Sequence, residues 1–511
     1  MSALRGAGRA RLWAFAAFVA LFTAAGLGLE TGDAVVTSVR GLSSAALIFL
    51  VAAGLSLIFG LMDVLNLAHG ELFALGAYVG WTVYVRPDTF LDFLTPLALF
   101  LVGPILGPLW ARRVALRRRW AWALAALGLV IAAVGFASYP LAIWDPEVYD
   151  QSPIVYSVAM DAGEPAAPPP AAPGRLPPAA AAFAALAGGI LAAAGAQSLA
   201  RRGRPRPRDP VKRGVYAAAA SAVAVALVAA AVNTSLTDWI FGRGTTLRFF
   251  IAVVVAVVSG FYMGRLVEIS LIRPLYERPI YQLMITLGLG FVLLESIRAV
   301  WGRSEVSMPR PEVFAGRGEG CPATNLGDLF EFGCSTIEVF GARIRAYNEI
   351  FIPLVGVVVL VGVSLLLKRT RVGMIIRAGV QDPDMVESLG VNVRSVFTTV
   401  FGLGVALAAL GGVLAAPASA LSPDMGSRLL VSALIALAIG GLTSFPGAAV
   451  GALVVGLLQQ FIIKYGQVGI DLPFLDEPFE PSPALVPAVI VLAMVVVLIA
   501  LPGGLLGRRP E

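Results

Sequence analysis

The stretch GLSLIFGLMDVLNLAHGELFALGAYVGW, residues 54–81, decides how the rest of the sequence is interpreted. It begins as an apolar helix, breaks at residues 60–63 and resumes as a helix rich in small residues. The residues that mark the break are Asp63, Asn66, His69, Gly70 and Glu71. A carboxylate at the centre of a membrane costs about 2.5–3.5 kcal/mol unless it faces protein or water. Because a broken helix at that depth is covered by protein or lines a cavity, the stretch predicts a pathway element rather than a lipid-facing span.

The composition is typical of a membrane protein. Of the 511 residues, 58% are hydrophobic and 14% are charged, whereas soluble domains contain about 25% charged residues. The apolar runs are too long and too uniform for the strands of a membrane barrel. We therefore expect an all-α polytopic membrane protein, a helical bundle of about 14 membrane segments, some of them broken or re-entrant.

The charge pattern indicates a topology. The expected segments cover residues 12–29, 37–60, 64–85, 96–111, 120–141, 179–199, 215–232, 247–266, 281–300, 349–367, 395–416, 428–443, 447–465 and 485–501. The net charge of +6 comes from arginines in short loops, which the positive-inside rule places in the cytoplasm. This predicts cytoplasmic termini and contact with membrane lipid, and it argues against nucleic acid as a partner. The segment 12–29 is interpreted as a retained helix, with a cleaved signal peptide as the alternative.

A second interrupted stretch resembles the first. The apolar run 429–439 ends in Gly440 and Gly441, and a helix of small residues resumes around Pro446 and Gly447. Transporters often contain two Gly- or Pro-interrupted segments, one in each half, beside the solute path. We expect the stretches 54–81 and 429–456 to form such a pair.

The polar residues of the first break have two interpretations each. His69 is either a gating residue hydrogen-bonded to Glu71 or Asn66, or a structural residue that ties the break to a neighbouring helix. Asp63 and Asn66 suit helix capping, in which a short polar side chain accepts from free N–H groups. Glu295 and Arg298, three residues apart on one expected helix, are either a structural pair or a contact for a zwitterionic solute.

The loop 368–394 contains the second element with a predicted function. Pro383 can begin a short helix capped by Asp382, and Gly390 can end it. Met385, Val386 and Leu389 would then form a small apolar face on a charged loop. Such a helix is typical of a docking element. An ordinary amphipathic cytoplasmic loop is the alternative.

The remaining chemistry-bearing residues are few. Cys321 and Cys334 share one long polar loop and form either a disulfide, if the loop faces an oxidising compartment, or two free thiols. With one histidine in the chain, no metal-ligand spacing or catalytic set is recognisable, and no phosphate-binding G-x-x-x-x-G-K-[ST] loop is present. The sequence therefore predicts no enzyme activity, no metal and no cofactor of its own.

The motif Asn66-Leu67-Ala68-His69-Gly70-Glu71 resembles one found in permease subunits of branched-chain amino-acid ABC importers, the LivH type. Further matching motifs follow in order at residues 272–275, 286–288, 377–390, 440–447 and 502–507. The resemblance covers residues 37–85 and 247–509. It implies a bacterial inner-membrane location, a second homologous permease, two ATP-binding subunits that use the ATP, and a periplasmic solute-binding protein. It also implies that residues 381–390 contact the ATPase, with the role falling on Gln381, Asp382, Met385, Glu387, Leu389 and Gly390.

The resemblance suggests a division of the chain into four parts. Residues 1–36 form an N-terminal helix, and residues 37–90 form the first permease half with the broken helix. Residues 91–246 are interpreted as inserted helices with a Pro/Ala-rich loop. Residues 247–511 complete the permease core, with a periplasmic loop at 302–348 and the coupling loop at 368–394.

Two other functions remain open at this point. Within the same family, the solute could be urea or a short amide. An ion-driven secondary transporter would instead need carboxylates in the membrane, for which Asp63, Glu71 and Glu295 are the candidates.

Overall fold

A computed structural model describes residues 2–114, 116–139, 176–200, 211, 213–276, 278–318, 320–381, 383–390, 392–470 and 478–507. Two features inferred from the sequence lie outside these residues: most of the Pro/Ala-rich loop, and Asp382. The chain forms two compact units. The first consists of Met1–Trp81, Phe249–Ala299 and Arg303–Glu511, and the second of Thr82–Arg248 and Val300–Gly302.

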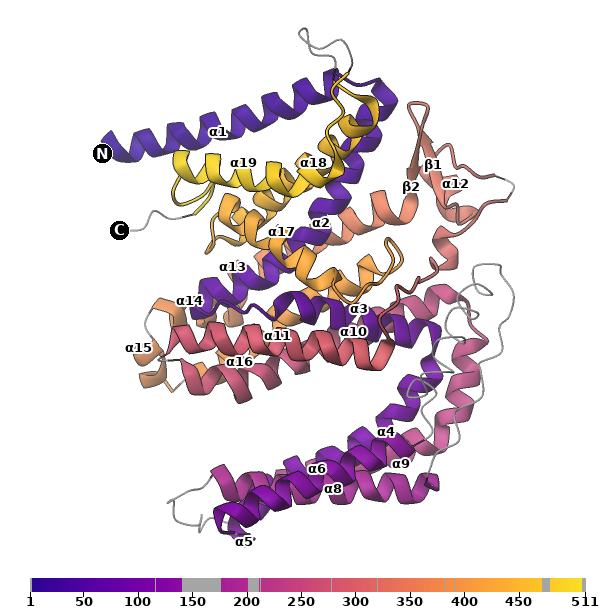
Figure 1. The fold of residues 1–511 in the computed structure, drawn as a ribbon, viewed down its shortest axis with the longest axis vertical. Helices are drawn as coiled ribbons and strands as arrows, with labels where there is room; N and C mark the ends of the chain where they lie inside the picture. Colours follow the sequence, from indigo (N-terminus) through magenta and orange to yellow (C-terminus); the bar gives the residue numbers. More distant parts are fainter. Residues whose placement is uncertain are drawn as a thin grey trace. The chain divides into compact units, whose positions relative to one another are not determined.

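The first unit is a helical bundle (Figure 1). Its helices are α1 (Ser2–Leu27), α2 (Thr31–Met62), α3 (His69–Val85), α10 (Thr245–Val267), α11 (Pro279–Trp301), α12 (Leu326–Glu331), α13 (Ile352–Arg369), α14 (Arg371–Gln381), α15 (Pro383–Ser388), α16 (Val393–Ala415), α17 (Met425–Gly440), α18 (Phe445–Val468) and α19 (Val486–Ala500). Helices α3, α10 and α11 each extend by a few residues across the boundary with the second unit. Two π-helical turns, Glu268–Ile272 and Ala346–Phe351, extend α10 and precede α13.

Helix α2 is the centre of the first unit. Its residues 50–53 are wholly buried, and its apolar side chains form one cluster with those of α16, α17, α18 and α19. Small residues allow these helices to approach closely, since a β-carbon added at Gly456 of α18 would lie 2.5 Å from the backbone nitrogen of Ala45 in α2. In a membrane, where lipid is as apolar as leucine, such close packing of small residues is a main source of helix association.

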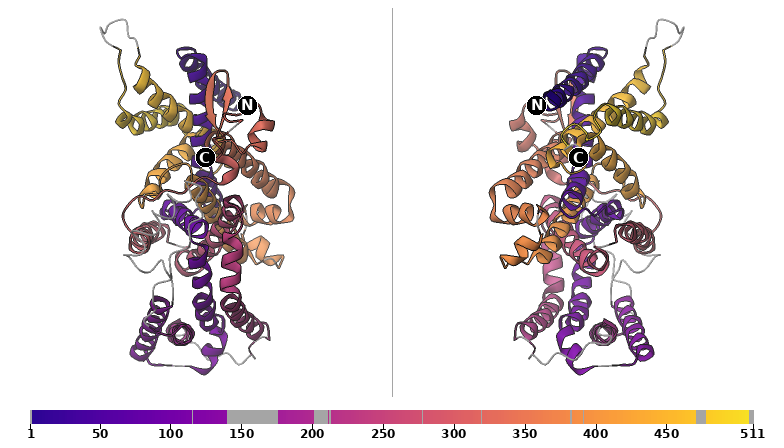
Figure 2. Two further views of the ribbon diagram at one scale, coloured as in Figure 1. Left: turned by 90° about the vertical axis from the view of Figure 1, so that its right-hand side faces the viewer. Right: turned by 90° about the vertical axis from the view of Figure 1, so that its left-hand side faces the viewer.

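A β-hairpin interrupts the helical pattern of this unit. Strands β1 (Thr336–Val339) and β2 (Ala342–Arg345) pair antiparallel around Phe340 and Gly341, both of which have positive φ. Strand β2 contacts the first turns of α2, and Figure 2 shows the hairpin beside them at what we call the hairpin end of the unit. The opposite end, where α14 and α15 lie, is the loop-helix end. The sequence indicated only a long polar loop here, because strands of four residues give too short a pattern to recognise.

The second unit is built from α4 (Pro87–Ile105), α5 (Gly107–Arg113), α6 (Arg118–Ser138), α8 (Pro178–Ala200) and α9 (Arg213–Phe241). Helices α6 and α8 pack through glycine and alanine. A β-carbon added at Gly128 would lie 2.2 Å from the nitrogen of Ala192, and one at Gly135 would lie 2.7 Å from the nitrogen of Ala185. Outward-facing residues of α6 and α9 are large and apolar, among them Trp122 and Leu227. This is the pattern of helices that contact one another through small residues and lipid through large ones.

The all-α polytopic membrane fold expected from the sequence is confirmed, but with fewer long segments. Within the described residues, nine helices are long and apolar enough to span a membrane, or ten if the bent pair α4 and α5 counts as one span. The expected segments 428–443 and 485–501 correspond to helices of 16 and 15 residues. At 1.5 Å per residue these reach about 22 to 24 Å, short of the roughly 30 Å of hydrocarbon in a bilayer. Hydropathy alone does not detect such shortening.

Candidate functional site

The break between α2 and α3 organises the candidate site. Helix α2 ends at Met62, and Asp63 follows in the left-handed conformation with φ 55°. Residues 63–68 are not helical, and α3 begins at His69. The chain therefore breaks where the sequence predicts, although the helix persists through Gly60. Asn66 Oδ1 accepts a hydrogen bond from the N–H of Ala68 at 3.1 Å, as a capping residue does, whereas Asp63 is exposed and ends α2 through its backbone.

The polar side chains of the break are buried in the first unit. Asn66 and His69 are 0% exposed and Glu71 is 6% exposed. Within the described residues, no hydrogen bond is formed by Asn66 Nδ2, by either ring nitrogen of His69 or by Glu71 Oε2. The imidazole does lie near the carbonyl of Val51 in α2, but outside hydrogen-bond geometry. The expected hydrogen bond from His69 to Glu71 or Asn66 is not formed, because the ring faces α2 rather than its own turn.

Three other helices, α11, α16 and α17, enclose this break together with α2. A β-carbon added at Gly54 of α2 would lie 2.7 Å from His69 Nε2 and 2.3 Å from the carbonyl oxygen of Gly404 in α16. On α11, Thr286 Oγ1 accepts a hydrogen bond from the N–H of Leu67 at 3.3 Å. The start of α17 touches Gly70, where an added β-carbon would lie 2.4 Å from the carbonyl oxygen of Gly426. These contacts hold a set of buried donors and acceptors where segments from distant parts of the sequence converge.

The second break has a different character. Helix α17 ends at Gly440, Gly441 has φ 111°, and Pro446 lies in the first turn of α18, where Ser444 Oγ accepts from the N–H of Gly447 at 3.1 Å. The backbones of α17 and α18 touch, since a β-carbon added at Gly440 would meet the carbonyl of Gly447. This break is thus a tight hairpin of two helices whose turn is formed by small residues.

The C-terminal turn covers the hairpin formed by helices α17 and α18, and the first break lies beside that pair of helices. Leu505 and Leu506 donate backbone hydrogen bonds to the carbonyls of Ile439 and Gly440, at 2.8 and 2.9 Å. A β-carbon added at Gly60 would lie 3.4 Å from the carbonyl oxygen of Thr443. The two interrupted stretches therefore meet, as expected of a pair, but only the first carries buried polar side chains.

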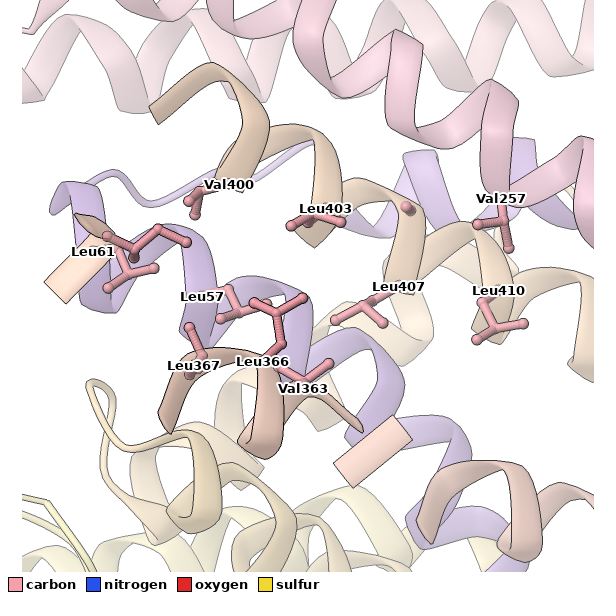
Figure 3. A pocket seen from close by; sticks show the side chains of 12 residues that line it. Leu57, Leu61, Val257, Val363, Leu366, Leu367, Val400, Leu403, Leu407 and Leu410 are labelled. Atoms are coloured by element: carbon pink, nitrogen blue, oxygen red, sulfur yellow. The ribbon is translucent and has the colours of Figure 1, made fainter. Parts of the chain in front are cut away.

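An apolar cavity lies next to the first break (Figure 3). Its volume is about 140 Å³, and its walls come from α2, α10, α13, α14 and α16. The lining residues are Leu57, Leu61, Val257, Val363, Leu366, Leu367, Ile376, Val400, Leu403, Ala406, Leu407 and Leu410. All of these side chains are hydrocarbons, so the cavity offers shape and apolar surface rather than hydrogen bonds.

The loop 368–394 contains two helices. Helix α14 packs back on α13, where a β-carbon added at Gly373 would lie 2.3 Å from the carbonyl of Leu366. The short helix α15 was expected to present Met385, Val386 and Leu389 together. Instead Val386 is 7% exposed and faces the unit, whereas Met385 is 63% and Leu389 75% exposed.

The exposed residues of α15 form a compact surface. Met385 and Leu389 are one helical turn apart, Glu387 is exposed between them, and Gly390 ends the turn with φ +83°. Gln381 is the last residue of α14, and Asp382 lies outside the described residues. Next along the chain, Asn392 caps α16 by accepting from the N–H of Ser395. The exposed surface of α15 is thus anchored directly to the helix that packs on Gly54.

A buried ion-pair network near this loop was not found from the sequence. Glu268, in the π-helical turn after α10, is 0% exposed and receives hydrogen bonds from Arg273, Tyr276 and Thr398. Thr398 belongs to α16, so the network joins the end of α10 to the start of α16. The motif at 272–275 contains Arg273, but its partner on α16 is more than 100 residues away and no local spacing reveals it.

The structure also shows both of the other residue pairs that the sequence singled out. Glu295 and Arg298 form an ion pair of 2.6 Å on α11, with side chains 59% and 33% exposed. Cys321 and Cys334 are joined by a disulfide in the segment that leads to the hairpin.

Comparison with known proteins gives a family match over most of the chain. The family described as "Branched-chain amino acid transport system / permease component" matches residues 37–164 and 213–499. The match includes parts of residues 91–246, for which the sequence motifs gave no counterpart. No solved structure matches.

Curated relatives match over shorter stretches. The chain is 32% identical over 139 residues to the high-affinity branched-chain amino acid transport system permease protein BraD of Pseudomonas aeruginosa, covering 27% of this chain and 44% of the relative. It is 28% identical over 175 residues to the permease protein LivH of Escherichia coli, covering 34% and 51%. It is 29% identical over 121 residues to the fructose import permease protein FruF of Bifidobacterium longum, covering 22% and 34%. The chain thus spans about half the length of the curated relatives it matches.

Proposed function

This chain belongs to the family of permease components of branched-chain amino acid transport systems, and from that premise we propose that it is the membrane-spanning subunit of an ATP-driven importer. The single observation that carries the proposal is the broken helix at Asp63–Ala68 inside the family match. There, buried hydrogen-bonding groups of Asn66, His69 and Glu71 have no protein partner within the described residues. Polar groups of this kind inside a membrane bundle mark a solute path.

Branched-chain or other hydrophobic amino acids are the proposed solutes. The relatives BraD and LivH are named for branched-chain amino acid transport. The cavity beside the break has only apolar walls, which suit an aliphatic side chain and offer no partner to sugar hydroxyls. The match to fructose permeases makes a sugar the second candidate, and uptake measured with labelled leucine and labelled fructose separates the two. Within the same family, urea or a short amide remains the alternative solute.

The drive comes from partner subunits in this proposal. ATP-binding subunits would dock on the exposed Met385 and Glu387 of α15 and on Leu389, which directly follows it, at the loop-helix end. A second permease and a solute-binding protein would complete the complex. The loop-helix end then faces the cytoplasm, and the hairpin end, which holds the disulfide, faces the oxidising periplasm. Both termini are proposed to be cytoplasmic, in a bacterial inner membrane.

The mechanism follows from what α15 is attached to. Movement of α15 is transmitted to α16, which begins four residues after Leu389 and contacts both Glu268 and Gly54. Because α16 also lines the apolar cavity, a shift of this helix changes the cavity and the contacts at His69 together. A solute is moved only if the two states of the bundle bind it differently, and the ATPase supplies the bias between them.

The experiment reverses a charge on the docking surface in one variant and deletes the surface in another. The complex is reconstituted with its ATPase partners, and ATP-driven uptake is measured for Glu387→Arg and for a deletion of residues 381–390. We expect both variants to insert normally and to lose at least about tenfold in uptake per ATP hydrolysed, because one reversed charge at an interface costs on the order of 1.4 kcal/mol or more. The matched control is Glu331→Arg, an exposed glutamate on the short helix α12. Wild-type uptake by the deletion variant would rule out the docking role.

A further inference from the structure

A polar pocket lies at the hairpin end of the first unit, away from the broken helix. Its volume is about 330 Å³, and it is formed by the start of α2, the hairpin and the last turns of α18, which lie close together in Figures 1 and 2. The lining residues are Glu30, Gly32, Asp33, Val36, Thr37, Arg40, Gly341, Ala342, Arg343 and Lys464. Pockets for small ligands begin at about 300 Å³, so this one has room for a single amino acid.

One face of α2 supplies the floor of this pocket. Asp33, Val36, Thr37 and Arg40 follow the i, i+3, i+4, i+7 spacing that brings side chains together on a helix. Thr37 is 4% exposed, so the pocket reaches down to buried surface. The floor therefore presents an acid, a hydroxyl and a base within two turns of the same helix.

Some of the charges in the pocket are already paired. Lys464 of α18 lies 2.7 Å from Asp33, and Arg40 Nε donates to the buried Glu349 at 3.1 Å. Glu349 Oε2 also accepts from the N–H of Arg345 at 2.6 Å, which fixes the carboxylate that holds Arg40. Arg40 thus uses one side of its guanidinium for the protein, and its side chain remains 45% exposed towards the pocket.

Other charges in the pocket have no partner among the residues that the structure describes. The terminal nitrogens of Arg40, the guanidinium of Arg343 and the carboxylate of Glu30 form no hydrogen bond or ion pair there. Glu338 lies directly opposite Arg343 in the strand register, yet no ion pair joins the two. The pocket therefore presents two cationic groups and one anionic group that can act on a ligand.

Charges of both signs line the pocket. Arg40, Arg343 and Lys464 supply three positive charges and Glu30 and Asp33 supply two negative ones, and the buried Glu349, which is not in the lining, pairs with Arg40. With Arg40 paired to Glu349, the other four charges of the lining sum to zero, which gives little advantage to a simple anion or a simple cation. The pocket favours a ligand that carries both charges a short distance apart, because only such a ligand contacts both sets.

We propose that this pocket is a second binding site, for a zwitterionic α-amino acid. The ligand carboxylate would lie between Arg343 and the free edge of Arg40, where a guanidinium can donate two parallel hydrogen bonds. Its ammonium would lie against Glu30, and its side chain against Val36. The proposal rests on the proposed function in one respect, namely that the hairpin end faces the side from which solute arrives. The site would then hold solute before it reaches the broken helix.

The test measures binding of L-leucine to the full purified chain in phosphatidylcholine nanodiscs, with no ATPase and no nucleotide. L-leucinamide lacks the carboxylate and isocaproate lacks the ammonium, so both are expected to bind at least about tenfold more weakly, each having lost a charge-assisted contact. Arg343→Gln and Glu30→Gln are expected to weaken L-leucine binding by about tenfold or more for the same reason. Arg317→Gln, an exposed arginine in the segment before the hairpin and outside the pocket, is the matched control and should bind as the wild type does.

The outcomes separate this proposal from the proposed function. Thermal unfolding is recorded for every variant, and a loss of binding counts only where the melting temperature is unchanged. Equal binding of L-leucine and isocaproate, or undiminished binding in both Arg343→Gln and Glu30→Gln, would overturn the site even if the complex imports leucine. Retention of phosphatidylethanolamine that is lost in Arg343→Gln, with no leucine binding, would show instead that the pocket holds a lipid headgroup. Binding that follows the expected pattern supports the site even if ATP-driven uptake fails.

Discussion

At the scale of single residues, Gly54 shows what sequence could and could not reveal. The helix break was predictable because Gly60 and Asp63 interrupt an apolar run, and the chain does break after Met62. The packing around His69 was not predictable, because Gly54 and Gly404 become neighbours beside it only when α2 and α16 pack. Local patterns show that a polar residue is costly in the membrane, whereas its partner depends on contacts hundreds of residues apart.

Gly54→Ala tests that packing. A β-carbon at this position would lie 2.3 Å from the carbonyl oxygen of Gly404, so the helices must separate. We expect a loss of about 1–3 kcal/mol in the free energy of unfolding, as for other overpacked cores. The measurement is reversible unfolding of the purified chain in mixed micelles.

Gly362→Ala is the matched control for this substitution. Gly362 lies in α13 with nothing within 4 Å of an added β-carbon, so the same change should be neutral or stabilise by about 0.4–1 kcal/mol. Equal effects of the two substitutions would contradict the close approach of α2 and α16.

At the scale of elements, both interrupted stretches lie where the sequence predicts them, and they differ in what surrounds the break. Both contain a helix break, but α17 and α18 form a tight hairpin of small residues, whereas α2 and α3 leave buried polar groups around His69. Glycine spacing predicts a break and close backbone contact equally well, so it cannot tell the two apart. The polar residues that follow the first break carry the distinction.

The network around Glu268 gives a prediction for the junction of α10 and α16. Arg273→Met removes two hydrogen bonds from a carboxylate that is 0% exposed. A buried charge left without its partner costs about 3–5 kcal/mol, so the variant should unfold at markedly lower denaturant. Glu268→Gln in the same chain removes the stranded charge and should recover part of that loss.

Arg298→Met provides the comparison for this experiment. Arg298 also pairs with a glutamate, Glu295, but both side chains are substantially exposed. Exposed pairs of this kind contribute at most about 1 kcal/mol, so the variant should unfold close to the wild type. If Arg273→Met were as mild as Arg298→Met, the network would have no role in joining the two helices.

At the scale of the whole molecule, composition alone predicted the class, and hydropathy located the apolar segments without giving the lengths of their helices. The described residues contain nine or ten helices that can span a membrane, against the 14 segments expected, because several apolar runs form helices of only 15 to 17 residues. The four-part division remains a prediction, although residues 82–248 do separate as a compact unit of their own.

The central claim is that this bundle conducts solute but is driven by other subunits, and transport by the purified chain tests it most directly. The chain is reconstituted into vesicles alone, and separately with its second permease and ATP-binding partners, and accumulation of labelled leucine is followed with and without ATP. We predict accumulation against a gradient only in vesicles that contain the partners and ATP. Accumulation by the chain alone, with no companion subunit and no nucleotide, would contradict the account.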